Sequence, residues 1–172
     1  MTYSPDFRLS IVSNPYLSSN LADPVTATTA QFKQLTVDDQ LAVLWYAYTE
    51  MGRSITPAAP GAARLQFAEG ILAQIKKMAY DEQLQVMRDL ASNANTPISR
   101  SYGVLSVNTK LAFWYQLGEM MVQGTVVPMP ASYQLSEAGR SVLEMIKQLD
   151  MGQQITVLRN TVVNMGVDPL AD

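Results

Sequence analysis

The chain has 172 residues, no Cys and no His, 12 Lys and Arg against 15 Asp and Glu, and a formal net charge of −3 at pH 7. The missing residue types exclude disulfides, thiol and imidazole catalysis and nearly all transition-metal sites, and the charge without basic clusters excludes a general nucleic-acid binder. A hydrophobic share of 48% against 16% charged residues predicts a folded chain with a sizeable core.

The N-terminal third of the chain predicts an arm followed by an aromatic helix. Residues 1–35 read as an arm that packs on the body and contains one short helix near 26–33. Residues 36–172 form the main helical domain. Its first helix covers 37–51, behind a Thr36 cap, and the residues on one face share helical spacing: Leu41, Leu44, Trp45, Tyr48 and Met51.

The middle of the chain predicts two further helices. A Pro- and Ala-rich linker at 53–60 leads into a helix over 60–78, in which Gly70 is expected to mark a close approach to a neighbouring element. A helix over 81–93 follows. Residues 94–106 show no periodicity and are expected to be irregular.

The C-terminal part predicts a second aromatic helix and two amphipathic ones. Ser106 or Asn108 caps a helix over 109–123, which ends at Gly124. Its main apolar face consists of Leu111, Trp114, Tyr115, Gly118, Met121 and Val122. A helix over 136–150 is expected to stop at Gly152, and a last helix covers 153–164. No segment alternates with the period of a strand, so the predicted fold is all-α.

Two sequence patterns recur at nearly one offset. WYxxxEM occurs at residues 45–51 and again at 114–120, an offset of 114 − 45 = 69. QLQVMRD at 83–89 resembles QITVLRN at 154–160, an offset of 154 − 83 = 71. Such an echo predicts an internal duplication of about 70 residues. We expect two lobes, about 36–105 and 106–168, related by a pseudo-twofold axis.

Catalytic and metal-binding patterns are absent from the sequence. It contains no Gly-rich phosphate loop, nucleophile elbow or metal-ligand spacing, and Glu50 and Glu119 suit contacts to neighbouring helices better than catalysis. We therefore expect no enzyme. Two interpretations of the aromatic and Met positions stay open: an ordinary core, or a slot that binds a long, thin, apolar ligand.

Five strings resemble one known family. They are LTVDDQLAVLWYAYTEMG (35–52), ITPAAPGAA (55–63), KLAFWYQLGEMM (110–121), PMPASYQLS (128–136) and GQQITVLRN (152–160). They closely resemble the N-terminal helical domain of the orange carotenoid protein, over roughly residues 20–168. The resemblance ends where that family's linker to a C-terminal sensor domain begins. It therefore implies a helical carotenoid protein, a stand-alone paralogue of that domain.

The resemblance implies a fold and a ligand. The fold would be two interleaved four-helix bundles, with a ketocarotenoid such as canthaxanthin or echinenone between them. The tunnel residues carried over are Leu41, Leu44, Trp45, Tyr48, Leu65, Met87, Leu111, Trp114, Tyr115, Gly118, Met121, Met129, Tyr133, Ile155 and Thr156. Arg159 and Asn108 match positions that the family uses to bind partners.

The resemblance also implies a function. The bound pigment would quench singlet oxygen or excitation energy in a photoprotective protein. One alternative is a constitutive quencher docked on the phycobilisome, and another is a carrier that delivers carotenoid to a separate protein like the family's C-terminal domain. An interaction module with a solid core and no ligand is the alternative from another class. The expected location is the cytoplasm, with the phycobilisome at the thylakoid membrane as a candidate partner, and no membrane span.

Overall fold

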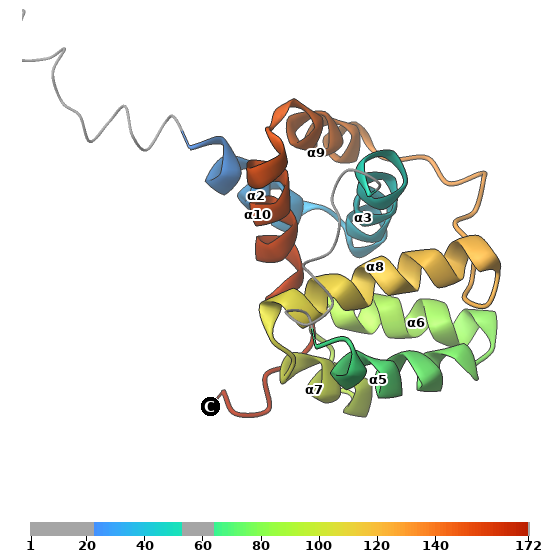
Figure 1. Cartoon of the computed structure of the whole chain (residues 1–172). Coiled ribbons are helices and arrows are strands. Elements are labelled where there is room, and N and C mark those ends of the chain that lie inside the picture. The colour runs from blue at the N-terminus through green and yellow to red at the C-terminus, as the bar shows by residue number, and fades with distance from the viewer. Residues whose placement is uncertain (1–22, 53–63, 172) are drawn as a thin grey trace, which may run out of the picture.

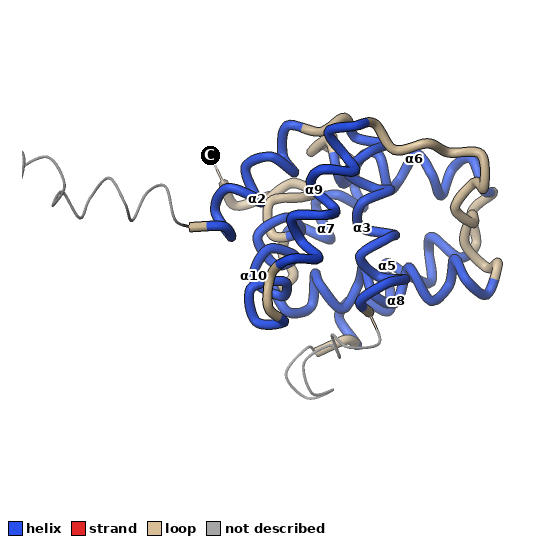
Figure 2. Tube along the Cα trace, turned by 90° about the horizontal axis from the view of Figure 1, so that it is seen from above, coloured by secondary structure: helices blue, strands red, loops and turns tan. Residues whose placement is uncertain are grey.

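The computed structural model of the chain describes residues 23–52 and 64–171. These residues form α2 (Pro24–Gln34), α3 (Val37–Met51), α5 (Gln66–Lys76), α6 (Tyr80–Ala91), α7 (Pro97–Gly103), α8 (Val107–Gln123), α9 (Glu137–Gln148) and α10 (Met151–Val162). No strand occurs in this part of the chain (Figure 2), so the predicted all-α fold is confirmed. None of its helices combines the length and the apolar character needed to cross a membrane.

Side-chain caps determine where most of the helices begin. Six helices start behind a residue whose side-chain oxygen accepts a hydrogen bond from the first turn: Asp23, Thr36, Thr96, Ser106, Ser136 and Asp150. The predicted caps at Thr36 and Ser106 are both present. Gly124 ends α8 in the left-handed conformation with φ 80°, as its position predicted.

The structure corrects the sequence prediction at three places. Residues 94–106 are not irregular, because Thr96 caps the short helix α7 and Pro97 opens it. Gly152 does not stop a helix but lies in the first turn of α10, whose capping box is made by Asp150 and Gln153. Gly70 marks no close approach, since a Cβ at this position would meet no atom within 4 Å.

The helices pack in two groups of four. Helix α2 lies against α9 and α10, and α9 also packs on α3. In the second group α5, α6 and α7 contact one another, while α8 packs on α5. Figure 1 shows the groups as an upper half with α2, α3, α9 and α10 and a lower half with α5 to α8. Each bundle therefore takes helices from both predicted lobes, 36–105 and 106–168.

The interleaving follows a pseudo-twofold pattern. The offset of about 70 residues relates α2, α3, α5 and α6 to α7, α8, α9 and α10 in that order. The contacts obey the same relation: α2 with α10 corresponds to α7 with α6, and α3 with α9 corresponds to α8 with α5. One hydrogen bond also repeats, because Gln83 Nε2 donates to the Ile75 carbonyl at 3.0 Å and Gln154 Nε2 to the Ile146 carbonyl at 3.1 Å.

Helix α7, which the sequence analysis did not predict, is held in place by the segment that follows α10. A Cβ on Gly103 would lie 1.9 Å from the Val167 carbonyl oxygen, so only glycine permits this approach. The Val167 amide donates to the Ser99 carbonyl at 3.0 Å, and Gly166, with φ 72°, lies against the ring of Tyr102. The segment after α10 therefore packs closely on α7.

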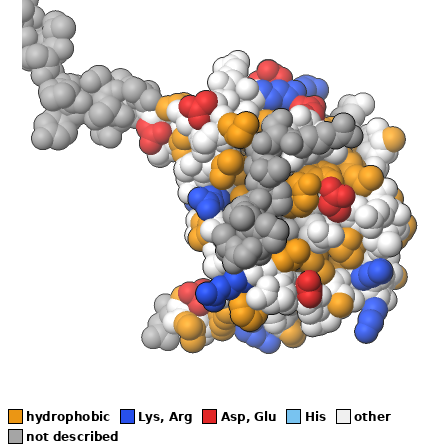
Figure 3. Space-filling model, in the orientation of Figure 1, with side chains coloured by type: hydrophobic (Ala, Val, Ile, Leu, Met, Phe, Trp, Pro, Cys, Tyr) orange, Lys and Arg blue, Asp and Glu red, His pale blue; other side chains and the backbone are white. Residues whose placement is uncertain are grey.

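Charge is dispersed on the face shown in Figure 3. Lys and Arg side chains of the described residues lie at separate points there, among acidic, hydrophobic and uncharged side chains. The described residues on this face form no continuous basic patch of the kind that binds a nucleic-acid backbone.

Candidate functional site

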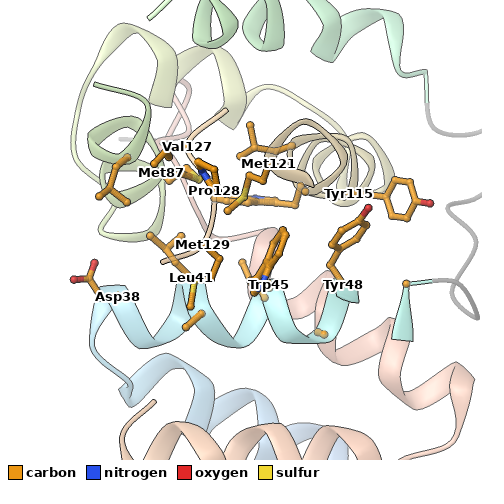
Figure 4. A pocket seen from close by; sticks show the side chains of 18 of the residues that line it. Asp38, Leu41, Trp45, Tyr48, Met87, Tyr115, Met121, Val127, Pro128 and Met129 are labelled. Atoms are coloured by element: carbon orange, nitrogen blue, oxygen red, sulfur yellow. The ribbon is translucent and has the colours of Figure 1, made fainter. Parts of the chain in front are cut away.

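The predicted aromatic faces of α3 and α8 meet and enclose an apolar cavity of about 180 Å³. We refer to it as the α3–α8 cavity. Twelve of the predicted tunnel residues line it: Leu41, Leu44, Trp45, Tyr48, Met87, Leu111, Trp114, Tyr115, Gly118, Met121, Met129 and Tyr133. Figure 4 shows Leu41, Trp45 and Tyr48 in a row along α3, facing Met121 and the segment that carries Met129. A cavity of this size exceeds the space of a single water molecule more than tenfold, so it is no ordinary packing defect.

Tyr48 lines the cavity at the end of the α3 row that lies away from Asp38 (Figure 4). Its ring lies directly over Gly118, where a Cβ would come within 2.9 Å of the ring carbon Cδ1. Its hydroxyl donates to Glu119 Oε1 at 2.5 Å, and its ring makes an edge contact with Tyr115 at 5.3 Å between centroids. Trp45 lies next to it, with 5.8 Å between centroids. Glycine at position 118 thus gives Tyr48 its place between the two helices.

Trp114 is fixed from behind by a buried tyrosine. Its Nε1 donates to the hydroxyl of Tyr102 at 2.9 Å, and that hydroxyl donates to the Val162 carbonyl at 2.7 Å. Burial raises the pKa of Tyr102 above its ordinary value. Phe113 packs edge-on against both rings, at 5.3 and 5.5 Å between centroids. Because the indole N–H is satisfied here, the ring of Trp114 offers the cavity an apolar surface.

The opposite end of the cavity is polar, and we name it the Arg88 mouth after Asp38, Arg88 and Tyr133. Arg88 donates from Nε and Nη2 to the two carboxylate oxygens of Asp38, at 2.9 and 3.1 Å. The Tyr133 hydroxyl donates to Asp39 Oδ1 at 2.7 Å. Burial, together with this bond to Asp39, raises the pKa of Tyr133 to about 12. Figure 4 shows Asp38 at the end of the α3 row, pointing away from the apolar side chains.

Comparison with known proteins places this architecture in a family. The family model described as "Orange carotenoid protein, N-terminal" matches residues 18–168. The chain belongs to this family. It is 62% identical to an orange carotenoid-binding domain-containing protein of Nostoc sp. strain PCC 7120 over 172 residues, the whole of both chains. The family resemblance seen in the sequence is confirmed.

Longer relatives contain the same fold as one part. The orange carotenoid-binding protein of Limnospira maxima is 55% identical over 147 residues, which are 86% of this chain and 46% of that protein. A structure of the Anabaena (Nostoc) sp. PCC 7120 orange carotenoid protein binding canthaxanthin matches with a TM-score of 0.79 and 61% identity, over 86% of this chain and 47% of that one. The chain thus spans less than half the length of these two relatives.

A shorter solved relative matches over nearly its full length. The structure of the red carotenoid protein of Anabaena (Nostoc) sp. PCC 7120, binding canthaxanthin, has a TM-score of 0.73 and 41% identity. The match covers 84% of this chain and 99% of that protein. The fold expected from the family, two interleaved four-helix bundles, is therefore that of a solved carotenoid-binding protein.

Three tunnel residues transferred from the family do not line the α3–α8 cavity. Leu65 precedes α5 and packs against the hydrophobic core, and Ile155 on α10 is partly buried against the same core. Thr156 is exposed, and its hydroxyl donates to the Gly152 carbonyl at 2.9 Å. Their role as tunnel residues stays a prediction.

The structure adds cavity residues that sequence reasoning missed: Asp38, Ala42, Ala47, Gly52, Leu84, Arg88, Leu117, Val127, Pro128, Pro130, Leu158 and Val162. Leu84, Arg88 and Leu158 lie within the duplicated QLQVMRD and QITVLRN strings, which were a usable signal. No periodicity marks Val127, because it lies in the loop between α8 and α9 and reaches the cavity through tertiary packing.

Arg159 and Asn108, the predicted partner-binding residues, contact each other and do not line the cavity. Arg159 Nη2 donates to Asn108 Oδ1, while Arg159 Nε is buried and has no hydrogen-bond partner among the described residues. The repeat places them opposite Arg88 and Asp38, at offsets of 159 − 88 = 71 and 108 − 38 = 70. Arg159 therefore bonds to a neutral amide where the first repeat has an ion pair, and no carboxylate among the described residues pairs with it.

The described residues contain no group of three or more His, Cys, Asp or Glu side chains that could hold a metal ion. The two glutamates that the repeat preserves are used in contacts between helices. Glu50 accepts from Lys147 Nζ on α9 at 2.7 Å, and Glu119 accepts from Tyr48 on α3. Both therefore serve the packing that the sequence analysis expected of them.

Proposed function

We propose that the protein binds a ketocarotenoid, such as canthaxanthin or echinenone, along the α3–α8 cavity and acts in photoprotection. The observation that carries the proposal is the apolar cavity between two aromatic helices, lined by Trp45, Tyr48, Trp114 and Tyr115. Two similar structures are described as binding canthaxanthin, one of them of nearly the same extent as this chain. A solid core would leave this space without an explanation.

The cavity residues fit a long conjugated molecule. Aromatic faces stack on flat π systems, and methionine side chains such as Met87, Met121 and Met129 adapt to irregular apolar shapes. The charged lining residues are Asp38 and Arg88, which neutralise each other at the mouth. A polyene with an oxygen-bearing end ring therefore meets apolar walls along its length and polar groups at one end.

The protein's part is to hold the pigment and to shape its surroundings. A bound carotenoid supplies an acceptor of energy from singlet oxygen or excited pigments and releases this energy as heat. Trp114, anchored through Tyr102, and Trp45 form rigid walls that exclude water and fix the pigment's position. Tyr48, anchored on Glu119, limits how far an end ring advances between α3 and α8.

Pigment analysis tests the proposal. Protein purified from carotenoid-producing cells is expected to show a strong visible absorption band, and chromatography of its extract should show one dominant ketocarotenoid. The same protein should shorten the lifetime of singlet oxygen more than its pigment-free form. A colourless protein from these cells would contradict pigment binding, whereas a coloured protein without any quenching would contradict photoprotection alone.

A protein partner is the second part of the proposal. Arg159, which pairs with no carboxylate among the described residues, favours a carboxylate on another protein, for which the phycobilisome and a separate C-terminal-domain-like carrier are the candidates. Mixing with phycobilisomes while following their fluorescence tests a docked quencher. Mixing with the carrier while following absorption tests pigment transfer. Arg159→Gln should weaken either effect, while Arg140→Gln, on the exposed side of α9, should leave both unchanged.

A further inference from the structure

Arg88 stands where the apolar cavity meets an open groove. It lines the α3–α8 cavity, and it also borders the adjoining groove with Thr36, Asp38, Ser92 and Tyr133. From this position we infer that Arg88 is a specificity residue, which donates a hydrogen bond to a ring oxygen of the bound carotenoid and selects oxygenated end rings over hydrocarbon ones. The inference rests on the proposed pigment binding.

At the Arg88 mouth, Arg88 keeps a hydrogen-bond donor that no other residue uses among the described ones. Asp38 accepts from the Nε N–H and from one N–H of Nη2, and no hydrogen bond within the described residues uses Nη1. Tyr133 cannot serve in its place, because its only proton goes to Asp39. Asp38 is an acceptor and cannot bind a keto oxygen. Of the three residues at the mouth, Arg88 is the one with an unused donor.

The ion pair also holds the guanidinium in place. Two parallel bonds to one carboxylate fix the plane of the Arg88 fork, so its outer edge keeps a constant direction. A keto oxygen at this edge would accept the hydrogen bond that Nη1 can donate. A hydrocarbon ring of the same size would cover the donor without accepting that bond, which is unfavourable.

The second repeat has no equivalent subsite. Arg159 occupies the corresponding position but donates to Asn108 and does not line the cavity. Both repeats have an arginine at this position, but only Arg88 lines the cavity, so we assign selection for an oxygenated ring to the Arg88 mouth.

A competition experiment with the full chain tests this inference. The protein is loaded from an equimolar mixture of canthaxanthin, with a keto oxygen on each end ring, and β-carotene, which has none. Its extracted pigments are then measured by chromatography. We expect the wild type to enrich canthaxanthin roughly fivefold, a modest factor because the Arg88 side chain is 41% exposed. Arg88→Met should bring the ratio of the two extracted pigments close to that of the mixture.

Two further variants distinguish whether Arg88 acts as a hydrogen-bond donor to the pigment or only as a structural brace. Asp38→Ala removes the ion pair that holds the guanidinium in place but keeps its donors, so it should retain part of the enrichment that Arg88→Met loses. Arg100→Met, which removes an exposed arginine on α7 bonded to Asn95, should behave as the wild type. Circular dichroism confirms that each variant is folded.

The outcomes are distinct. Unchanged enrichment in Arg88→Met would overturn the inference and leave pigment binding intact. Equal loss of enrichment in Arg88→Met and Asp38→Ala would also overturn it, because the ion pair would then act only as a brace. Failure of the wild type to hold either pigment would refute the proposed function, and the inference with it.

Discussion

At the scale of single residues, Asp39 joins two segments that are far apart in the chain. It is 4% exposed at the start of α3, and it accepts hydrogen bonds from the hydroxyls of Tyr133 and Ser136, just before α9. Burial alone would raise the pKa of Asp39, but the bonds from Ser136 and Tyr133 outweigh it and hold the pKa below 3.8. The folded state therefore favours the charged carboxylate.

This contact predicts a pH dependence of stability. The pKa of Asp39 is lower in the folded than in the unfolded chain. The contribution of Asp39 to the free energy of unfolding is therefore fully present above about pH 4 and is lost as the pH falls through the lower pKa of the folded state. Asp39→Asn should reduce the free energy of unfolding by about 2 kcal/mol at pH 7 and flatten its fall at acidic pH. Denaturant unfolding measured between about pH 2 and about pH 7 checks both.

Asp81→Asn is the matched control for Asp39→Asn. Asp81 is exposed in the first turn of α6, so its replacement should change the free energy of unfolding by less than about 0.5 kcal/mol. If Asp39→Asn kept the acid dependence of the wild type, the role assigned to this carboxylate would be wrong.

At the scale of elements, the crossing of α3 and α8 depends on one glycine. A methyl group at position 118 would lie 2.9 Å from the ring of Tyr48, which would have to move away from Glu119. Gly118→Ala gains about 1 kcal/mol of helix propensity and loses a hydrogen bond of about the same value, so net stability should change little. The pigment spectrum should shift, because a wall of the cavity is displaced.

A second glycine provides the comparison for Gly118→Ala. Gly70 lies inside α5, and the methyl group of an alanine there would meet no atom within 4 Å, so Gly70→Ala should stabilise the protein by up to about 1 kcal/mol. It should leave the absorption spectrum unchanged. Equal spectra for both variants would show that Tyr48 does not shape the pigment's surroundings.

Sequence reasoning succeeded where a signal repeats along the chain. The faces of the helices containing Trp45 and Trp114 have helical spacing, and the echo between them predicted the duplication. It failed for α7, because seven residues are too few for a periodic apolar face to emerge. At the site, Val127 could not be predicted, because it lies in a loop and packing between distant segments brings it to the cavity.

At the scale of the whole molecule, neither half of the duplication can form a bundle alone. Each bundle takes two helices from residues before position 94 and two from residues after it. Fragments 1–93 and 94–172 should each show little helix by far-UV circular dichroism, because their apolar faces lack partners. Mixing them should restore helix and cooperative unfolding. Cooperative unfolding of either fragment by itself would contradict the interleaved arrangement.

The interleaving also decides when the cavity can first exist. Its lining extends from Asp38 to Val162, so the ribosome must release nearly the whole chain before the walls can close. During synthesis α3 leaves the ribosome early, and Trp45 stays exposed to solvent until the later helices have been synthesised. Insertion of the proposed pigment would therefore follow translation. Until synthesis is complete, the nascent chain exposes an aromatic surface, which a chaperone can bind and through which the chain can aggregate.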